Sequence, residues 1–282
     1  MSLLPAIPLL EAAHRLSDIQ LVELGLVTFA IGIVGGMVGI ALGVIRLPFM
    51  TLLGVDPFIA AGDNLAVSFL GSIGGSFPHF FGGRVVWRVV ILIGIPAVIG
   101  AFIGGRFAHL IPVWGVLFIV SALVLWSGAL IIRRSLSELK ETRLTGRRPS
   151  EGARGTLTRG TIIREGFLGV VIGVVGGAVG LALGVLRMPA LVAVLKMDPL
   201  YAAGTNLAMT VLIGAAGFSG HLLGGRNDWR LLASTGTASM ISMFIGARLS
   251  VRLAPGKLRL FIGVVLVTIA PVLLWDAVGR MA

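Results

Sequence analysis

The chain has 282 residues, of which 56% are hydrophobic and only 12% are charged, and its mean hydropathy is +1.02. About a quarter of the residues of an ordinary globular protein are charged, so this composition excludes a soluble domain. Cysteine is absent, which excludes disulfides, cysteine-based metal sites and thiol nucleophiles.

Eight apolar runs follow one another along the chain, and each is about long enough to cross a bilayer as a helix. They lie near residues 21–45, 57–82, 87–105, 112–132, 166–186, 200–223, 229–250 and 258–278. None of them alternates between apolar and polar residues, as the strands of a β-barrel do. The sequence therefore predicts an all-α, polytopic membrane protein with the lipid bilayer as its surroundings.

Charge divides the chain into four parts. Residues 1–20 form an amphipathic lead-in that lacks the charged leading region of a signal peptide. Residues 21–132 and 166–282 are two transmembrane units, and residues 133–165 are a basic linker with nine basic and four acidic side chains. Basic loops stay on the cytoplasmic side of a membrane, so we expect this linker in the cytoplasm. The same rule explains the net charge of +11 without a nucleic-acid partner.

The second unit repeats the first. GGMVGIALGVIRLP (35–48) returns as GGAVGLALGVLRMP (176–189), and AAGDNLA (60–66) returns as AAGTNLA (202–208). So many matches at nearly constant spacing predict two homologous repeats. Internal repeats are common among secondary transporters, which bind substrate where the repeats meet near the bilayer midplane. The basic residues of the short loops leave open whether the repeats run in the same or in opposite directions.

The first apolar run of each repeat is unsuited to one straight helix. Residues 21–55 stay apolar and are interrupted by Arg46 and Pro48. A residue that precedes a proline disfavours helical geometry, so we expect a helix to end at Leu47. Four glycines within residues 35–43 also permit a local break. We therefore predict a broken, glycine-rich first helix, followed by a short helix and three ordinary crossings.

An aspartate–proline pair follows this element in both repeats. Asp56-Pro57 and Asp198-Pro199 match the preference for an aspartate N-cap followed by proline at the first helical position. We expect these aspartates to cap helices rather than to carry protons.

The strongest candidates for substrate binding are Arg46 and Arg187, which occupy equivalent positions two residues before a proline. Charged side chains within apolar runs are costly and tend to face a functional cavity. Two guanidiniums without a carboxylate nearby in sequence favour an anion, and their planar forks suit a tetrahedral oxyanion such as sulfite or a sulfonate. The alternative is that both side chains extend to lipid headgroups at helix ends.

Two polar pairs accompany the arginines as candidate substrate ligands. Asn64 and Ser68 in the first repeat, like Asn206 and Thr210 in the second, are one helical turn apart and share a helix face. Interhelical hydrogen bonds are the alternative, because polar side chains form them routinely in membranes.

Three further residues are candidates for proton transfer or coupling. Asp63 has Thr205 as its counterpart, and it either carries a proton or pairs with a basic residue such as Arg46. His79 and His221 are equivalent to each other, and they either relay protons or form hydrogen bonds at the membrane interface.

No motif indicates an enzyme. The chain contains no Walker A sequence, no HExxH and no G-x-S-x-G. We expect no catalytic residue, no cofactor and no bound metal.

With these residues in view, the chain resembles the TauE/SafE family of sulfite and organosulfonate exporters, also called DUF81-type permeases. The resemblance rests on the glycine-rich stretch ending in IRLP or LRMP, the Asp-Pro pair, AAGxNLA and a later H-x-x-G-G, and it covers nearly the whole chain. It implies a bacterial inner-membrane permease that exports small sulfur-containing anions such as sulfite or sulfoacetate. Two alternatives are a structural or assembly protein of the membrane and an anion channel without specific sulfonate transport. Glycine-rich helices are also compatible with a homodimer.

Overall fold

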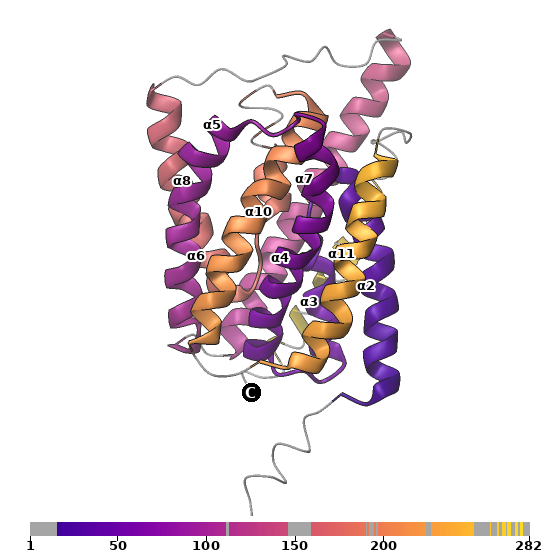
Figure 1. Cartoon of the computed structure of the whole chain (residues 1–282), viewed down its shortest axis with the longest axis vertical. Coiled ribbons are helices and arrows are strands. Elements are labelled where there is room, and N and C mark those ends of the chain that lie inside the picture. Colours follow the sequence, from indigo (N-terminus) through magenta and orange to yellow (C-terminus); the bar gives the residue numbers. More distant parts are fainter. Residues whose placement is uncertain are drawn as a thin grey trace, which may run out of the picture.

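The computed structural model describes residues 16–110, 113–145, 159–189, 191, 195, 197–223 and 227–250, together with scattered positions between 260 and 278. These residues are almost entirely helical and form no β-strand, which confirms the all-α fold class. The long helices lie side by side along the longest axis of the molecule (Figure 1).

The first half of the chain forms one broken element and three further helical stretches. The broken element consists of α2 (Asp18–Val38) and α3 (Gly43–Leu52), and α4 follows it (Pro57–Phe81). The next crossing consists of α5 (Trp87–Val89), a π-helical turn (Val90–Gly94) and α6 (Ile95–Phe107), and it ends in a 3-10 turn (Ala108–Leu110). α7 then runs over Val113–Thr145.

The second half shows the same order of long and short helices. Its elements are α8 (Arg159–Val179), α9 (Gly184–Pro189), α10 (Pro199–Leu222) and α11 (Trp229–Leu249). The last apolar run, near residues 258–278, lies largely outside the described residues.

A glycine in the left-handed conformation ends the first long helix of each half. Gly39 follows α2 and Gly180 follows α8, and both have a φ of 74°. Residues 40–42 and 181–183 are then non-helical before the short helix begins. Glycine adopts this conformation without steric cost, so it is the residue that breaks the apolar run.

The predicted helix end at Leu47 is wrong. Leu47 and Pro48 both lie inside α3, which continues to Leu52. Pro48 is in the second turn of a short helix, so its missing N–H removes a single main-chain hydrogen bond, to the carbonyl group of Val44. Glycine rather than proline therefore sets the position of the break.

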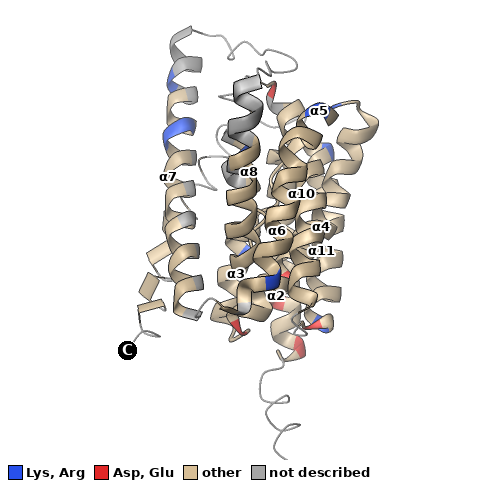
Figure 2. Cartoon of the chain, turned by 90° about the vertical axis from the view of Figure 1, so that its left-hand side faces the viewer, with Lys and Arg blue, Asp and Glu red and all other residues tan. Residues whose placement is uncertain are grey.

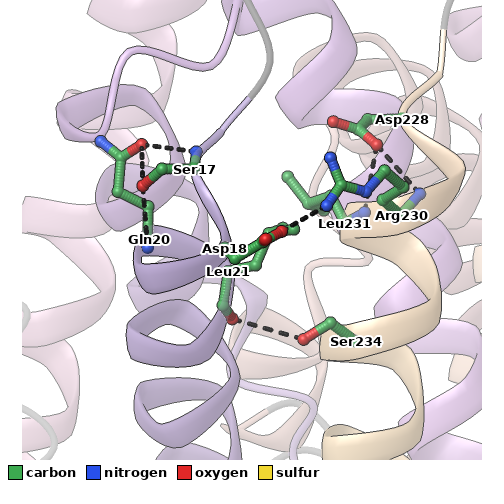
Figure 3. Close-up of polar contacts among 8 residues, drawn as sticks. All are labelled: Ser17, Asp18, Gln20, Leu21, Asp228, Arg230, Leu231 and Ser234. Atoms are coloured by element: carbon green, nitrogen blue, oxygen red, sulfur yellow. Dashed lines mark hydrogen bonds and ion pairs between the residues drawn. The ribbon is translucent and has the colours of Figure 1, made fainter.

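α2 and α11 lie side by side and run in the same direction. Asp18 at the start of α2 forms an ion pair with Arg230 at the start of α11, and Ser234 donates a hydrogen bond to the carbonyl oxygen of Leu21 at 3.3 Å (Figure 3). Ser17 begins α2 with a capping box, in which its hydroxyl oxygen accepts a hydrogen bond from the main-chain N–H of Gln20. The two helices therefore start at the same end of the molecule.

The central pair, α4 and α10, is antiparallel. Gly62 near the start of α4 lies against His221 near the end of α10, and Gly204 near the start of α10 lies against His79 near the end of α4. On either side of this pair, α11 packs on α4 and α6 packs on α10.

α6 and α8 form a second parallel pair, which corresponds to α11 and α2. Along it Gly173 approaches Ala97, and one turn later Gly177 approaches Ala101. The contacts give two sets of directions: α2, α4 and α11 run one way, and α6, α8 and α10 run the other way. Helices that correspond in sequence, such as α2 and α8 or α4 and α10, are therefore antiparallel.

Five helices in the described part of the chain are long and apolar enough to cross a membrane. They are Asp18–Val38, Pro57–Phe81, Trp87–Phe107, Leu117–Ser137 and Leu200–Leu222. Most of the residues in the described helices are uncharged (Figure 2). The chain is therefore a multi-pass membrane protein, while the predicted number of eight apolar crossings stays a prediction.

Helices extend into the predicted linker from both sides. α7 continues to Thr145 and α8 begins at Arg159, so within residues 133–165 only 146–158 lie outside the described residues. Of the predicted lead-in, residues 1–15 lie outside them as well. The four domain boundaries stay predictions.

Both predicted helix caps are confirmed. The Asp56 carboxylate accepts a hydrogen bond from the N–H of Phe58 at 2.9 Å, and the Asp198 carboxylate accepts one from the N–H of Leu200 at 2.8 Å. Proline follows each aspartate at the start of the helix. These aspartates are used to begin α4 and α10, the two central helices.

Replacing Gly39 by alanine is expected to destabilise the protein strongly. The new Cβ atom would overlap Ala203 of α10, and the left-handed conformation adds strain of about 1–2 kcal/mol. Gly54→Ala is the matched control, because Gly54 also has a positive φ, 89°, but no described atom lies within 4 Å of the added Cβ. Melting temperatures in one detergent check this, and equal losses for the two variants would contradict the close contact with Ala203.

Candidate functional site

Arg46 lies in the first half of α3 and is directed towards α4. Its Nε donates a hydrogen bond to Oδ1 of Asn64 at 2.8 Å. Its Nη2 donates to the carbonyl oxygen of Asn64 at 3.1 Å and to the hydroxyl of Ser68 at 2.9 Å. The arginine is 3% exposed, and Asn64 and Ser68 are buried as well. The structure therefore brings these three candidate residues of the first half into one cluster.

Arg187 lies in α9 and forms the corresponding cluster with α10. Its Nε donates to Oδ1 of Asn206 at 3.2 Å, and its Nη2 donates to the hydroxyl of Thr210 at 2.7 Å. Nη1 donates to the carbonyl oxygen of Ala182 at 2.6 Å, within the non-helical stretch that precedes α9. All three candidate residues of the second half are buried and in contact.

Each asparagine also binds the main chain of both halves. The Nδ2 of Asn64 donates to the carbonyl oxygen of Gly43 at 3.2 Å and to that of Gly180 at 2.7 Å. Reciprocally, the Nδ2 of Asn206 donates to the carbonyl oxygens of Gly184 at 3.1 Å and Gly39 at 3.0 Å. We call these two sets of hydrogen bonds the amide clamps.

The amide clamps place the two helix breaks beside each other. One clamp joins the end of the first non-helical stretch to the beginning of the second, and the other clamp joins the two remaining ends. Residues 39–43 and 180–184 therefore run in opposite directions through the centre of the molecule. The carbonyl groups of Gly39 and Gly180 lie just beyond the ends of α2 and α8, and the asparagine amides supply donors that the apolar surroundings do not.

Within the described ranges, neither Arg46 nor Arg187 forms an ion pair with a carboxylate. A buried charge is costly unless it is paired and hydrogen-bonded. The amides, hydroxyls and carbonyls around Arg46 and Arg187 satisfy N–H donors but carry no net negative charge. The site therefore has an excess of positive charge, which favours an anion.

The two arginines differ in where their remaining donors lie. Arg187 uses Nε and both terminal nitrogens in hydrogen bonds, whereas Arg46 uses Nε and Nη2. The Nη1 of Arg46 makes no hydrogen bond with any described residue. A guanidinium carries five N–H donors, and each arginine uses three of them with described residues, so both keep two for a ligand. In Arg46 the two donors lie together on Nη1, whereas in Arg187 one lies on Nη1 and one on Nη2.

Asp63 does not pair with Arg46, contrary to one of the two expectations for it. It is fully buried in α4, and its Oδ2 accepts a hydrogen bond from the main-chain N–H of Asp228 at 3.1 Å. Its other oxygen, Oδ1, has no hydrogen-bond partner among the described residues.

His79 and His221 are buried between the central helices, where His79 lies against Gly204 and His221 against Gly62. The Nε2 of His221 lies 2.8 Å from the carbonyl oxygen of Gly177, while both ring nitrogens of His79 lack partners within the described structure. Neither histidine is hydrogen-bonded to Asp63 or to the arginine clusters. A proton relay through these histidines has no continuous hydrogen-bond path in the described residues.

Sequence reasoning found the side chains of the two clusters but missed the main-chain groups that join them. The carbonyl oxygens of Gly39 and Gly180 accept hydrogen bonds from the opposite half, and Ala182 accepts one from Arg187. The glycines themselves were visible in the repeated stretch, but their carbonyl groups have no signature in sequence.

These features define a multi-pass helical membrane protein with a polar, positively charged site at its broken helices. The family model described as "Sulfite exporter TauE/SafE" matches residues 24–273. The chain belongs to this family.

The chain is also similar to several proteins named as probable membrane transporters. It is 26% identical to the "Probable membrane transporter protein YdhB" of Bacillus subtilis over 79% of this chain and 87% of that protein. It is 24% identical to a "Probable membrane transporter protein" of Xylella fastidiosa strain Temecula1 over 89% of this chain and 92% of that protein. No solved structure matches the chain. The family and these names support a membrane transporter.

Replacing Asn64 by alanine is expected to cost about 1–3 kcal/mol for each buried group left unpaired. The variant removes the acceptor of Arg46 Nε and the donor to the Gly180 carbonyl. Ser76→Ala is the matched control in the same helix, because the hydroxyl of Ser76 only binds the carbonyl of Ile73, within α4. Unfolding free energies in mixed micelles check this, and a loss no greater than that of the control would contradict the clamp.

Proposed function

We propose that this chain is a secondary transporter that exports small sulfur-containing anions, sulfite or organosulfonates such as sulfoacetate, across the inner membrane of a bacterium. The observation that carries the proposal is the pair of buried guanidiniums of Arg46 and Arg187, neither of which has a carboxylate partner among the described residues. The family description names the same class of anion. The named relatives of this chain belong to bacteria.

The chemistry of the site suits a sulfur oxyanion. Sulfite and sulfonates present several oxygen acceptors, and a guanidinium offers parallel N–H donors in a fixed plane. In the proposed bound state, Nη1 of Arg46 donates to the anion, while Asn64 and Ser68 hold the rest of the guanidinium in place. Arg187, whose two remaining donors are divided between Nη1 and Nη2, contributes positive charge and positions the second break.

The arrangement of the helices supports alternating access. We propose that the two halves are inverted repeats, since helices that correspond in sequence run in opposite directions. Exchange of conformation between two such halves opens a central site first to one side of the membrane and then to the other. The non-helical stretches at Gly39 and Gly180 are the proposed joints.

Export of an anion needs no further energy source under ordinary conditions. A membrane potential that is negative inside favours exit by about 2.3 kcal/mol per charge for each 100 mV. An oxyanion with one or two negative charges therefore leaves the cell downhill unless its concentration outside greatly exceeds its concentration inside.

Thermal stabilisation of the purified protein by an anion panel tests the proposal. The panel contains sulfite, sulfate, thiosulfate, sulfoacetate, other alkyl sulfonates and matched carboxylates. A ligand that binds the folded state alone raises the melting temperature, with about 2.7 kcal/mol of stabilisation at one hundred times its Kd. We expect a sulfur-containing anion to stabilise the wild type, and Arg46→Ala to abolish the shift.

Arg230→Ala is the matched control, because Arg230 is an exposed arginine outside the site and pairs with Asp18. It is expected to keep the full shift. We expect the Arg187→Ala variant to bind the anion more weakly than the wild type does, but still to bind it. If Arg46→Ala and the control respond alike, or if no anion stabilises the wild type, the arginines hold helices together and anion binding at this site is contradicted.

A further inference from the structure

Asp63 joins the two halves of the chain at the beginning of α11. The hydrogen bond from the N–H of Asp228 to its Oδ2, 3.1 Å long, connects α4 of the first half to the N-terminus of α11 of the second half. Asp228 is itself the N-cap of α11 and accepts hydrogen bonds from Arg230 and Leu231 (Figure 3). Two aspartates therefore meet at the start of this helix, where the positive end of its dipole favours negative charge.

The second half makes the same connection with an uncharged side chain. The hydroxyl of Thr205 in α10 accepts a hydrogen bond of 3.0 Å from the main-chain N–H of Val86, directly before α5. Thr205 corresponds to Asp63, and Val86 corresponds to Asp228, in the alignment of the two halves. A hydroxyl oxygen is thus sufficient to accept this hydrogen bond, so the carboxylate of Asp63 offers something that the contact itself does not require.

The second oxygen of Asp63 takes no part in this contact. Oδ1 is fully buried, and it has no hydrogen-bond partner among the described residues. A buried polar atom without a partner is uncommon and costly, and a protein keeps it where it serves a function. A carboxylate oxygen in this position is a site for one proton.

None of the charged groups that the structure describes around Asp63 neutralises it. From α11 it faces the carboxylate of Asp228, and the neighbouring Arg230 is engaged with Asp18 of α2. From α10, His221 lies against Gly62, one residue before Asp63. From α3, Arg46 binds Asn64, one residue after it, and is directed along the other face of α4 towards Ser68. None of these groups forms an ion pair with Asp63.

We propose that Asp63 is a proton-binding site that couples anion transport through this chain to the movement of a proton. Oδ1 takes up one proton from water and the carboxylate becomes neutral, while Oδ2 keeps the hydrogen bond from Asp228. Protonation changes the charge at the contact between α4 and α11, which belong to different halves, and so biases the arrangement of the two halves. The proton site does not depend on the proposed function. The coupling of this site to anion transport does rest on the proposed function.

Infrared titration of the purified protein, in a detergent without carbonyl groups, tests the proton site without any substrate. A protonated carboxylic acid has a carbonyl band that a carboxylate lacks. We expect a component of this band to appear in the wild type as the pH is lowered and to be absent from Asp63→Thr. Threonine keeps an acceptor for the N–H of Asp228, as Thr205 does for Val86.

Two further variants keep this test decisive. Asp63→Asn has nearly the shape of the aspartate and serves if the threonine variant does not fold. Asp56→Asn changes an aspartate that caps α4 from its partly exposed end, and it is expected to keep the Asp63 component. If the titrating component persists unchanged in both Asp63 variants, Asp63 does not bind the proton and the proposal is overturned.

Proteoliposomes loaded with sulfoacetate and a pH-sensitive dye test the coupling. We expect efflux from wild-type vesicles to be accompanied by a change of internal pH, and efflux from Asp63→Thr vesicles to lose that change. Wild-type efflux without a pH change would overturn the coupling. The absence of any wild-type efflux would instead overturn the proposed function for this anion, and the infrared titration would still decide whether Asp63 binds a proton.

Discussion

Two side-chain amides hold the centre of this molecule together. Each break in a helix leaves main-chain carbonyl groups without partners in surroundings that contain little water, and such groups are too costly to leave unpaired. Asn64 and Asn206 solve this for both halves at once, because each donates to a carbonyl of its own half and to one of the other. Glycines set where the helices break, and these hydrogen bonds then hold the two breaks against each other and against the helices that receive the arginines.

The same arrangement explains why a charged site is tolerated there. Once the amide nitrogens hold the main chain, the amide oxygens are left to accept the Nε of each arginine. Ser68 and Thr210, one turn further, accept the second donor. Polar groups that are required to break a helix thus also hold a guanidinium, and together they leave positive charge at the centre of an apolar bundle.

Much of this site was predictable from the sequence, because similar motifs occur in both halves of the chain. The alignment of Arg46 with Arg187, and the helical spacing of Asn64 and Ser68, identified side chains that the structure brings into contact. The N-caps at Asp56 and Asp198 are local motifs and were predicted for that reason.

What the sequence did not predict depends on contacts between distant segments. The partner of Asp63 is a main-chain N–H 165 residues away, and a main-chain group has no identity in sequence. The directions of the two halves follow from which glycines meet which helices. The prediction of a helix end at Leu47 was wrong because a short helix tolerates the one hydrogen bond that Pro48 cannot make. The left-handed conformation of Gly39, by contrast, ends α2.

The exchange of contacts between halves has a consequence for biosynthesis. α2 packs mainly on α11, and the amide of Asn64 binds the carbonyl of Gly180. Helices that are synthesised early therefore have their partners in segments that are synthesised late. When only the first half has been made, Asn64, which binds Arg46, still lacks its hydrogen bond to the carbonyl of Gly180. The first half alone therefore lacks the partners that α2 and Asn64 have in the complete structure.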